Sequence, residues 1–163
     1  EEILPHLDHQ LDRFEIRICG AEEMPRDLRR RLDHPNVKLM GFVPDIQKEI
    51  LASDIFLVPT PIDLGFRTRI VEGMALGACV VTHEANQRGM PELEHDQNCL
   101  IGSSGEGLAD LIVQAAKDPD LRQRLGLSAR KTYEGKLDSR ISCGFIVDKL
   151  EQIAVKVPVP VGG

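Results

Sequence analysis

Residues 55–82 constrain the fold most, because this stretch joins two short apolar runs through a loop and a helical pattern. The first run, residues 55–58, stops at Pro59, and the second run, residues 79–82, begins shortly after Gly77. Two parallel strands need a long crossover between them, which is usually a helix. The stretch therefore predicts a βαβ unit with two parallel strands in one sheet.

The same alternation of short apolar runs and helical patterns extends along the chain. Predicted strands cover residues 14–19, 37–40, 55–58, 79–82 and 99–101. Predicted helices cover residues 2–12, 24–32, 45–52, 68–76, 108–116, 119–133 and 141–155. This pattern is typical of α/β domains, in which helices cover both faces of a parallel sheet. We therefore predict a Rossmann-like, three-layer α/β fold.

Length and charge limit the class of protein. A chain of 163 residues suggests one domain. We assign residues 1–154 to it and residues 155–163 to an extended tail, in which Pro158 and Pro160 exclude a central strand. The formal net charge of -6 argues against nucleic acid as the main partner, since phosphate backbones bind basic surfaces. No apolar run approaches the roughly 18 residues of a membrane helix.

The cysteines and histidines give no sign of a metal site. Three of the four cysteines lie in strand-like runs and the fourth in a helix-like one, and none forms a CxxC pair: Cys19, Cys79, Cys99 and Cys143. No histidine lies near them at ligand spacing, so we expect no metal. We expect four buried free thiols in a reducing compartment. Because no signal-peptide pattern opens the chain, we expect a cytoplasmic protein.

The loop before the predicted helix at 68–76 carries the chemistry that suggests a ligand. Gly65 and Arg67 lie at the start of that helix, where backbone N–H groups and a guanidinium suit an anion such as phosphate. Glu72, about one turn further on, could accept hydrogen bonds from sugar hydroxyls. Arg69 is two residues from Arg67 and therefore points elsewhere. Surface arginines and a solvated helix acid remain open as the alternative.

Six segments, taken in chain order, resemble a known set of motifs. They are residues 36–43 (NVKLMGFV), 51–60 (LASDIFLVPT), 72–81 (EGMALGACVV), 89–93 (GMPEL), 98–101 (NCLI) and 120–126 (DLRQRLG). Together they resemble the C-terminal, nucleotide-sugar-binding domain of retaining GT-B glycosyltransferases, the group 1 or GT4-type family. The resemblance covers residues 14–135. Each motif alone is weak, whereas the ordered set is fairly specific.

The resemblance implies the donor-binding half of a hexosyltransferase-type enzyme, which moves a sugar from a nucleotide diphosphate sugar to an acceptor with retention. The donor is a substrate, so no cofactor is implied. The implied site residues are Glu72 and Asp63 for catalysis, and Gly65, Phe66, Arg67, Thr68, Val43, Pro44 and Lys48 for the nucleotide. His83 follows a predicted strand near the same cleft and is open to either a sugar contact or a structural role. Glu92 matches the acid of the family's GxPEL motif and is equally open to a role as a helix-entry acid.

The chain also departs from the family pattern. The family often has an acid eight residues before the position of Glu72, and here that position is Leu64. Asp63 is one residue away and could substitute only through a register shift. Arg67 stands where the family often has glycine. A GT-B epimerase or phosphorylase-like enzyme, or a non-catalytic nucleotide-sugar-binding or scaffold domain, remains an alternative, and Leu64 favours the non-catalytic one.

Two parts of the family pattern have no counterpart: the first strand, with its basic residues, and the N-terminal acceptor domain. We therefore expect a fragment that is inactive alone, whose partners are the donor sugar and that acceptor domain. Membrane contact is expected only through parts outside this chain. The doubly wound order places the first strand between strands 14–19 and 55–58. We expect this gap to close by direct pairing of those two strands or through a homodimer.

Overall fold

A computed structural model describes residues 2–7, 13–20, 24–141, 143, 144, 147 and 149 of the chain. Within these residues, five strands form two parallel sheets. The first sheet pairs β1 (Ile16–Cys19) with β2 (Val37–Gly41). The second has the order β3 (Phe56–Val58), β4 (Val80–His83), β5 (Leu100–Gly102). The parallel α/β architecture predicted from the sequence is confirmed, and each predicted strand is present to within two residues at either end.

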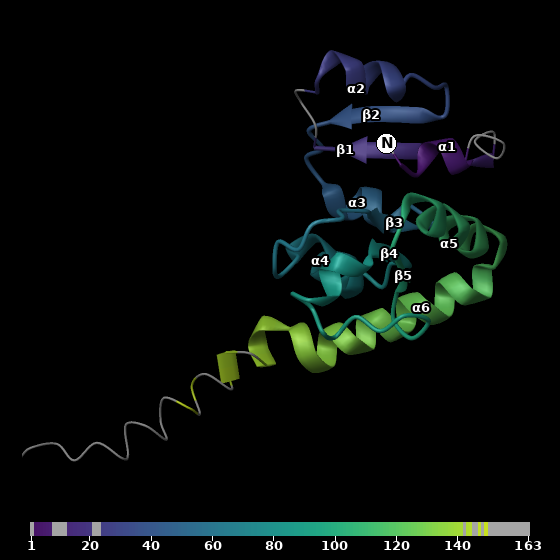
Figure 1. Cartoon of the computed structure of the whole chain (residues 1–163). Helices are drawn as coiled ribbons and strands as arrows, with labels where there is room; N and C mark the ends of the chain where they lie inside the picture. Colours follow the sequence, from purple (N-terminus) through teal and green to yellow (C-terminus); the bar gives the residue numbers. More distant parts are fainter. Residues whose placement is uncertain are drawn as a thin grey trace, which may run out of the picture.

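Helices alternate with the strands (Figure 1). They are α1 (Leu4–Leu7), α2 (Arg26–Arg31), α3 (Ile46–Leu51), α4 (Thr68–Ala75), α5 (Gly105–Lys117) and α6 (Pro119–Thr132), with a 3-10 turn η2 (Glu84–Gln87) and a π-turn η3 (Tyr133–Leu137). Side-chain caps set several of the starts: Asp45 accepts from Lys48 N at 3.1 Å and Asp118 accepts from Leu121 N at 2.9 Å. These caps satisfy N–H groups that have no partner within the helix.

The helix predictions fail in one place and run outside the described residues in two others. Helix α5 begins at Gly105 rather than at residue 108, because Ser104 accepts a hydrogen bond from Gly107 N and caps an earlier turn. The predicted helix 2–12 is present at Leu4–Leu7, and residues 8–12 lie outside the described part. Of the predicted helix 141–155, residues 141, 143, 144, 147 and 149 are helical. Its other residues, and the tail at 155–163, lie outside the described part.

The strands of the second sheet supply two cores, one on each face. Successive side chains of β4 point to opposite faces, so Val81 joins the core beneath α5 while Val80 joins the core beneath α4. Leu57 and Leu100 belong to the first core, and Val58 belongs to the second. This burial on both faces accounts for the continuous apolar runs in the sequence.

The predicted pairing of β1 with β3 is wrong. Among the described residues no backbone hydrogen bond joins the two strands, and Figure 1 shows β1 and β2 lying apart from the other three strands. The reason is that apolar packing bridges the two sheets instead. Ile16 of β1 and Leu57 of β3 contact the same core, which also contains Leu7 of α1. A homodimer across this gap stays a prediction.

The cysteines follow the predicted pattern only in part. All four thiols are free. Cys79 and Cys99 are buried, and burial raises the pKa of Cys79 to about 11 and that of Cys99 to about 12. The expectation of burial is wrong for Cys143, which is exposed in the last helical stretch, while Cys19 is half-buried. Within the described part, no helix has the length and hydrophobicity needed to cross a membrane.

Helix α6 meets the turn after α4 through two glycines, which leads to a prediction. A Cβ atom at Gly126 of α6 would collide with the carbonyl oxygen of Gly77. We expect Gly126→Ala to lower the free energy of unfolding by about 1–2 kcal/mol, since overpacking outweighs the gain in helix propensity. Denaturant unfolding measures this change. The matched control is Gly107→Ala in α5, where the nearest atom to the new methyl is Ser104 Oγ at 3.3 Å. Equal stability of the two variants would contradict the prediction.

Candidate functional site

The loop that leads into α4 is fixed by local backbone geometry. Gly65 has a φ of 73°, a left-handed conformation that favours glycine. Its N–H donates to Asp63 Oδ1 at 3.1 Å, which closes an Asx turn. Asp63, one of the two predicted catalytic acids, therefore has one carboxylate oxygen engaged in shaping the loop.

A second glycine holds this loop against its neighbour. A Cβ atom at Gly89 would overlap the backbone of Gly65, so the two loops touch backbone to backbone. The sequence contains Gly89 within the GMPEL motif, but nothing local indicates which segment it contacts. The loops that follow β3 and β4 are thereby brought together at the carboxyl ends of the strands, where ligands of such sheets bind.

Arg67 is anchored at the start of α4 by neutral partners. Its Nε donates to Asn86 Oδ1 at 2.9 Å and its Nη2 donates to the carbonyl oxygen of Ile62 at 3.1 Å. Within the described part of the chain, no carboxylate is paired with Arg67, so its positive charge is not neutralised. Helix α4 also begins without a side-chain cap. The first N–H groups of a helix without such a cap favour an anion. Arg69, the second residue of α4, is exposed.

Glu72 lies further along α4 and faces helix α3. Its side chain is half-buried, and Gln47 Nε2 lies 3.5 Å from Glu72 Oε1, the outer limit of a hydrogen bond. Gln47 was not predicted from the sequence, because an exposed glutamine in a short helix carries no local signal. The contact brings the start of α3, which follows Val43 and Pro44, next to the acid of α4.

The other predicted site residues lie on the same side but are less engaged. Lys48 has an 83% exposed side chain, and its ammonium lies 3.2 Å from Asp45 Oδ2. Phe66 and Thr68 are exposed beside Arg67, Pro44 is exposed, and Val43 is half-buried. Among the described residues, no hydrogen bond or ion pair links the Lys48 side chain to Glu72 or Arg67.

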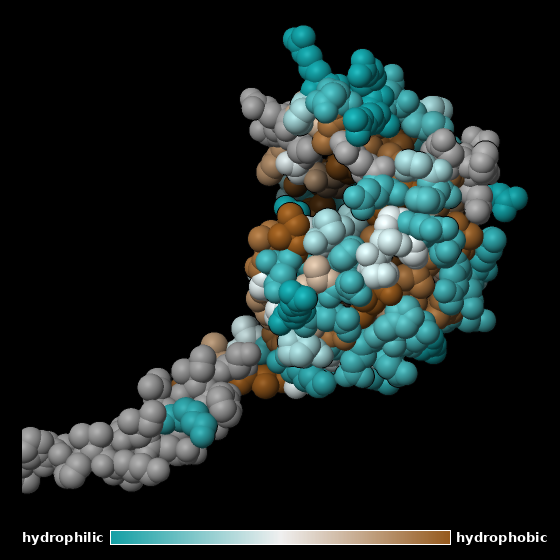
Figure 2. All heavy atoms as spheres, in the orientation of Figure 1, coloured by the Kyte–Doolittle hydropathy of each residue, from teal (hydrophilic) through white to brown (hydrophobic). Residues whose placement is uncertain are grey.

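Large apolar side chains surround this region. Phe42 is 71% exposed, Leu64 is 63% exposed and Phe66 is 56% exposed. Leu64 occupies the position where the family often has an acid, and its exposure places an apolar group at that point of the loop. Figure 2 shows a hollow on the side where β1 and β2 end, between their loops and the part that contains α4, with hydrophobic side chains on its border.

His83 and Glu92, the two open candidates, have structural contacts. His83 Nδ1 accepts from Ala85 N at 3.1 Å, and its Nε2 lies 3.2 Å from the carbonyl oxygen of Ser103. The backbone carbonyl of Glu92 accepts from Asn98 Nδ2 at 2.8 Å. Both ring nitrogens of His83 are thus already in use.

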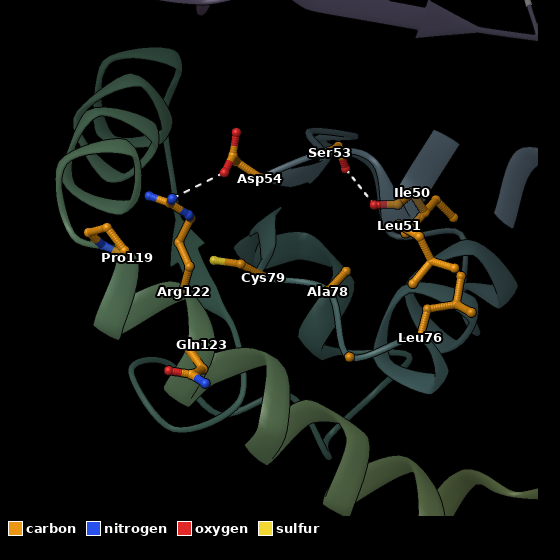
Figure 3. Close-up of a pocket in the computed structure, with 11 residues that line it drawn as sticks. Ile50, Leu51, Ser53, Asp54, Leu76, Ala78, Cys79, Pro119, Arg122 and Gln123 are labelled. Carbon is orange, nitrogen blue, oxygen red and sulfur yellow. Dashed lines mark hydrogen bonds and ion pairs between the residues drawn. The ribbon is translucent and has the colours of Figure 1, made fainter. Parts of the chain in front are cut away.

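A pocket of about 300 Å³ lies at the opposite end of β3 and β4, between α3, the end of α4 and the start of α6 (Figure 3). Arg122 points into it but is satisfied by the protein. Its Nη1 donates to the carbonyl oxygens of Ala115 and Ala116 at 2.7 and 3.0 Å, and its Nη2 pairs with Asp54 at 3.1 Å. The guanidinium therefore stabilises the end of α5, and the pocket is separate from the site at the carboxyl ends of the strands.

Comparison with known proteins identifies the family. Residues 1–118 match the family model described as "Glycosyl transferases group 1", and the chain belongs to this family. No curated protein sequence matches the chain.

Solved structures show the same fold at low identity. HepE from Anabaena in complex with UDP has a TM-score of 0.83 and 20% identity, over 92% of this chain and 44% of HepE. HepE has also been solved with UDP-glucose. A glycosyltransferase from Rickettsia africae has a TM-score of 0.79 and 16% identity, over 95% of this chain and 44% of that protein. The chain thus spans less than half the length of these proteins.

The contact between Gly65 and Gly89 yields a prediction about the loop. We expect Gly89→Ala to push the 63–67 loop away and to cost about 1–3 kcal/mol of stability. Hydrogen exchange of the Gly65 N–H, followed by NMR, should speed up because its bond to Asp63 is weakened. The control is Gly135→Ala, since a methyl group there meets no atom within 4 Å. An unchanged exchange rate at Gly65 in Gly89→Ala would show that the contact does not hold the loop.

Proposed function

We propose that this chain is the donor-binding domain of a retaining glycosyltransferase that transfers a sugar from a nucleotide diphosphate sugar to an acceptor. The observation that supports it most is the position of Arg67, which has no acidic partner among the described residues and lies beside the uncapped start of α4. The family match and the similarity to HepE, a protein solved with UDP, favour the same ligand class.

The proposed chemistry rests on stabilising the leaving group. Negative charge grows on the diphosphate as the glycosidic bond breaks, and fixed donors aimed at that charge lower the barrier. Arg67 and the first N–H groups of α4 would supply these donors. Glu72, near Gln47, would accept hydrogen bonds from the ribose hydroxyls, with Val43 and Pro44 beside the base. The retaining course is part of the proposal and follows from the family resemblance alone.

A second candidate is a domain that binds the nucleotide sugar without catalysing transfer. The specific observation in its favour is Leu64, an exposed apolar residue where the family often has an acid. Asp63, the nearest acid, is engaged by Gly65 N. Turnover by the complete enzyme, compared with UDP binding by this chain, separates the two candidates. A GT-B epimerase would convert the nucleotide sugar without transfer to an acceptor, and a phosphorylase-like enzyme would exchange the sugar with phosphate as the acceptor.

The partner domain and the cellular location are also part of the proposal. The partner of this domain would be an N-terminal acceptor domain of the same enzyme, in keeping with the share of HepE that the chain covers. A cytoplasmic location is part of the proposal, and the free thiols are compatible with it.

The role of Glu72 is tested by substitution. We expect Glu72→Ala to weaken binding of UDP to the chain, and donor use by the complete enzyme, by about 2–3 kcal/mol, because a hydrogen bond to a charged group is lost. Isothermal titration calorimetry with UDP and kcat/KM for the donor measure the two effects. The control is Glu106→Gln, an exposed acid on α5. Unchanged values for Glu72→Ala would remove Glu72 from the site.

The activity of the chain alone gives a second test. One domain cannot form a cleft that excludes water on both sides, so we expect no transfer of sugar from UDP-glucose by the 163-residue chain. Chromatography of radiolabelled UDP-glucose after incubation measures transfer and hydrolysis together. The Glu72→Ala chain gives the background from contaminating enzymes. Turnover above that background would overturn the expectation that the chain is inactive alone.

A further inference from the structure

Asn86 is a buried polar residue that the predicted site did not include. It lies in η2, directly after β4, and is 1% exposed. Its Oδ1 accepts from Arg67 Nε at 2.9 Å. Its Nδ2 donates to Thr82 Oγ1 at 2.9 Å, with the carbonyl oxygens of His83 and Thr60 at 3.2 and 3.4 Å. A fully bonded amide at this depth is costly to move, because any other orientation leaves buried polar atoms without partners.

The partners of Asn86 fix which way its amide faces. Arg67 can only donate, and the two backbone carbonyls can only accept. A rotated amide would place its NH₂ group against the guanidinium and its oxygen against two carbonyl oxygens. The network therefore holds Oδ1 toward Arg67 in one orientation.

The same network connects Arg67 to the ends of two buried strands. Thr82, the third residue of β4, is fully buried, and its Oγ1 donates to the carbonyl oxygen of Val58 at 3.0 Å. Val58 is the last residue of β3. Asn86 thus connects the Arg67 guanidinium to the sheet through hydrogen bonds.

The neutral charge of Asn86 matters as much as its position. An aspartate there would form an ion pair with Arg67. Asparagine instead orients the guanidinium and leaves its positive charge available to a ligand. The guanidinium has five N–H donors, of which Nε–H and one on Nη2 are used. Within the described residues, the remaining donors have no protein acceptor.

We infer that Asn86 is a positioning residue, which holds the Arg67 guanidinium in place, without an ion pair, for binding the diphosphate of the donor. This inference rests on the proposed function. Asn86 itself would not touch the ligand and would act through Arg67.

A double-mutant cycle with UDP as the probe tests this inference on the full chain. We expect Asn86→Ala to lower the affinity for UDP about tenfold, as for residues coupled in one network. In an Arg67→Ala background the same change should have no further effect, because there is no guanidinium left to position. The control is Asn98→Ala. Asn98 is 3% exposed and fully bonded, to Glu92 O, Thr132 Oγ1 and Glu94 N, but does not contact Arg67. The Asn98→Ala substitution should lower the stability of the chain and leave its affinity for UDP unchanged.

A second measurement needs no folded Asn86 variant. In the unsubstituted chain, the Nε–H of Arg67 should exchange with water more slowly than that of Arg69, which is exposed on the same helix. NMR of arginine side chains measures both rates.

The outcomes separate this inference from the proposed function. Equal losses of UDP affinity from Asn86→Ala in the two backgrounds, or equal exchange rates for Arg67 and Arg69, would overturn the positioning role alone. An unsubstituted chain that binds neither UDP nor another nucleoside diphosphate would overturn the proposed function and this inference with it.

Discussion

The burial of β4 on both faces is the constraint on which the rest of the structure depends. Val80, Val81 and Thr82 are each fully buried, so the strand must be covered by helices on two sides. Val80 and Val81 supply one core each, and Thr82 begins the polar network that reaches Arg67. The same short strand therefore determines the layers of the fold and the position of the group proposed to bind the ligand.

Glycines control how closely the covering elements approach this sheet. Gly126 lets α6 contact the turn after α4, and Gly89 lets one loop contact another at Gly65. In both places backbone meets backbone, with no side chain between to adjust. Arg130 of α6 also donates to the carbonyl oxygen of Ala75 at the end of α4. These contacts hold the end of α4, which carries Glu72, and the loop before it, which carries Arg67.

The parts of the fold that could be predicted from the sequence are those that local sequence patterns indicate. Apolar runs located the strands, and Asp45 and Pro119 located helix starts. Gly65, Arg67 and Glu72 were grouped because they share one loop and one helix. Gln47 and Asn86 were missed, since each contacts the site from another segment and nothing in its neighbours indicates this. The cost of unpaired backbone groups predicts either pairing of β1 with β3 or a homodimer. The pairing is absent among the described residues, and side chains of both strands pack against one core instead.

The separation of the sheets has a mechanical consequence for the proposed site. Val43, Pro44 and Gln47 follow β2, while Arg67 and Glu72 follow β3, so the two sides of the site belong to different hydrogen-bonded sheets. Within a sheet, ladder bonds fix neighbouring strands about 4.8 Å apart. Between β1 and β3, in the described part, apolar contact takes the place of a ladder. We therefore expect the width of the proposed site to depend on side-chain volume in the core around Leu7, Ile16 and Leu57, none of which is proposed to touch the ligand.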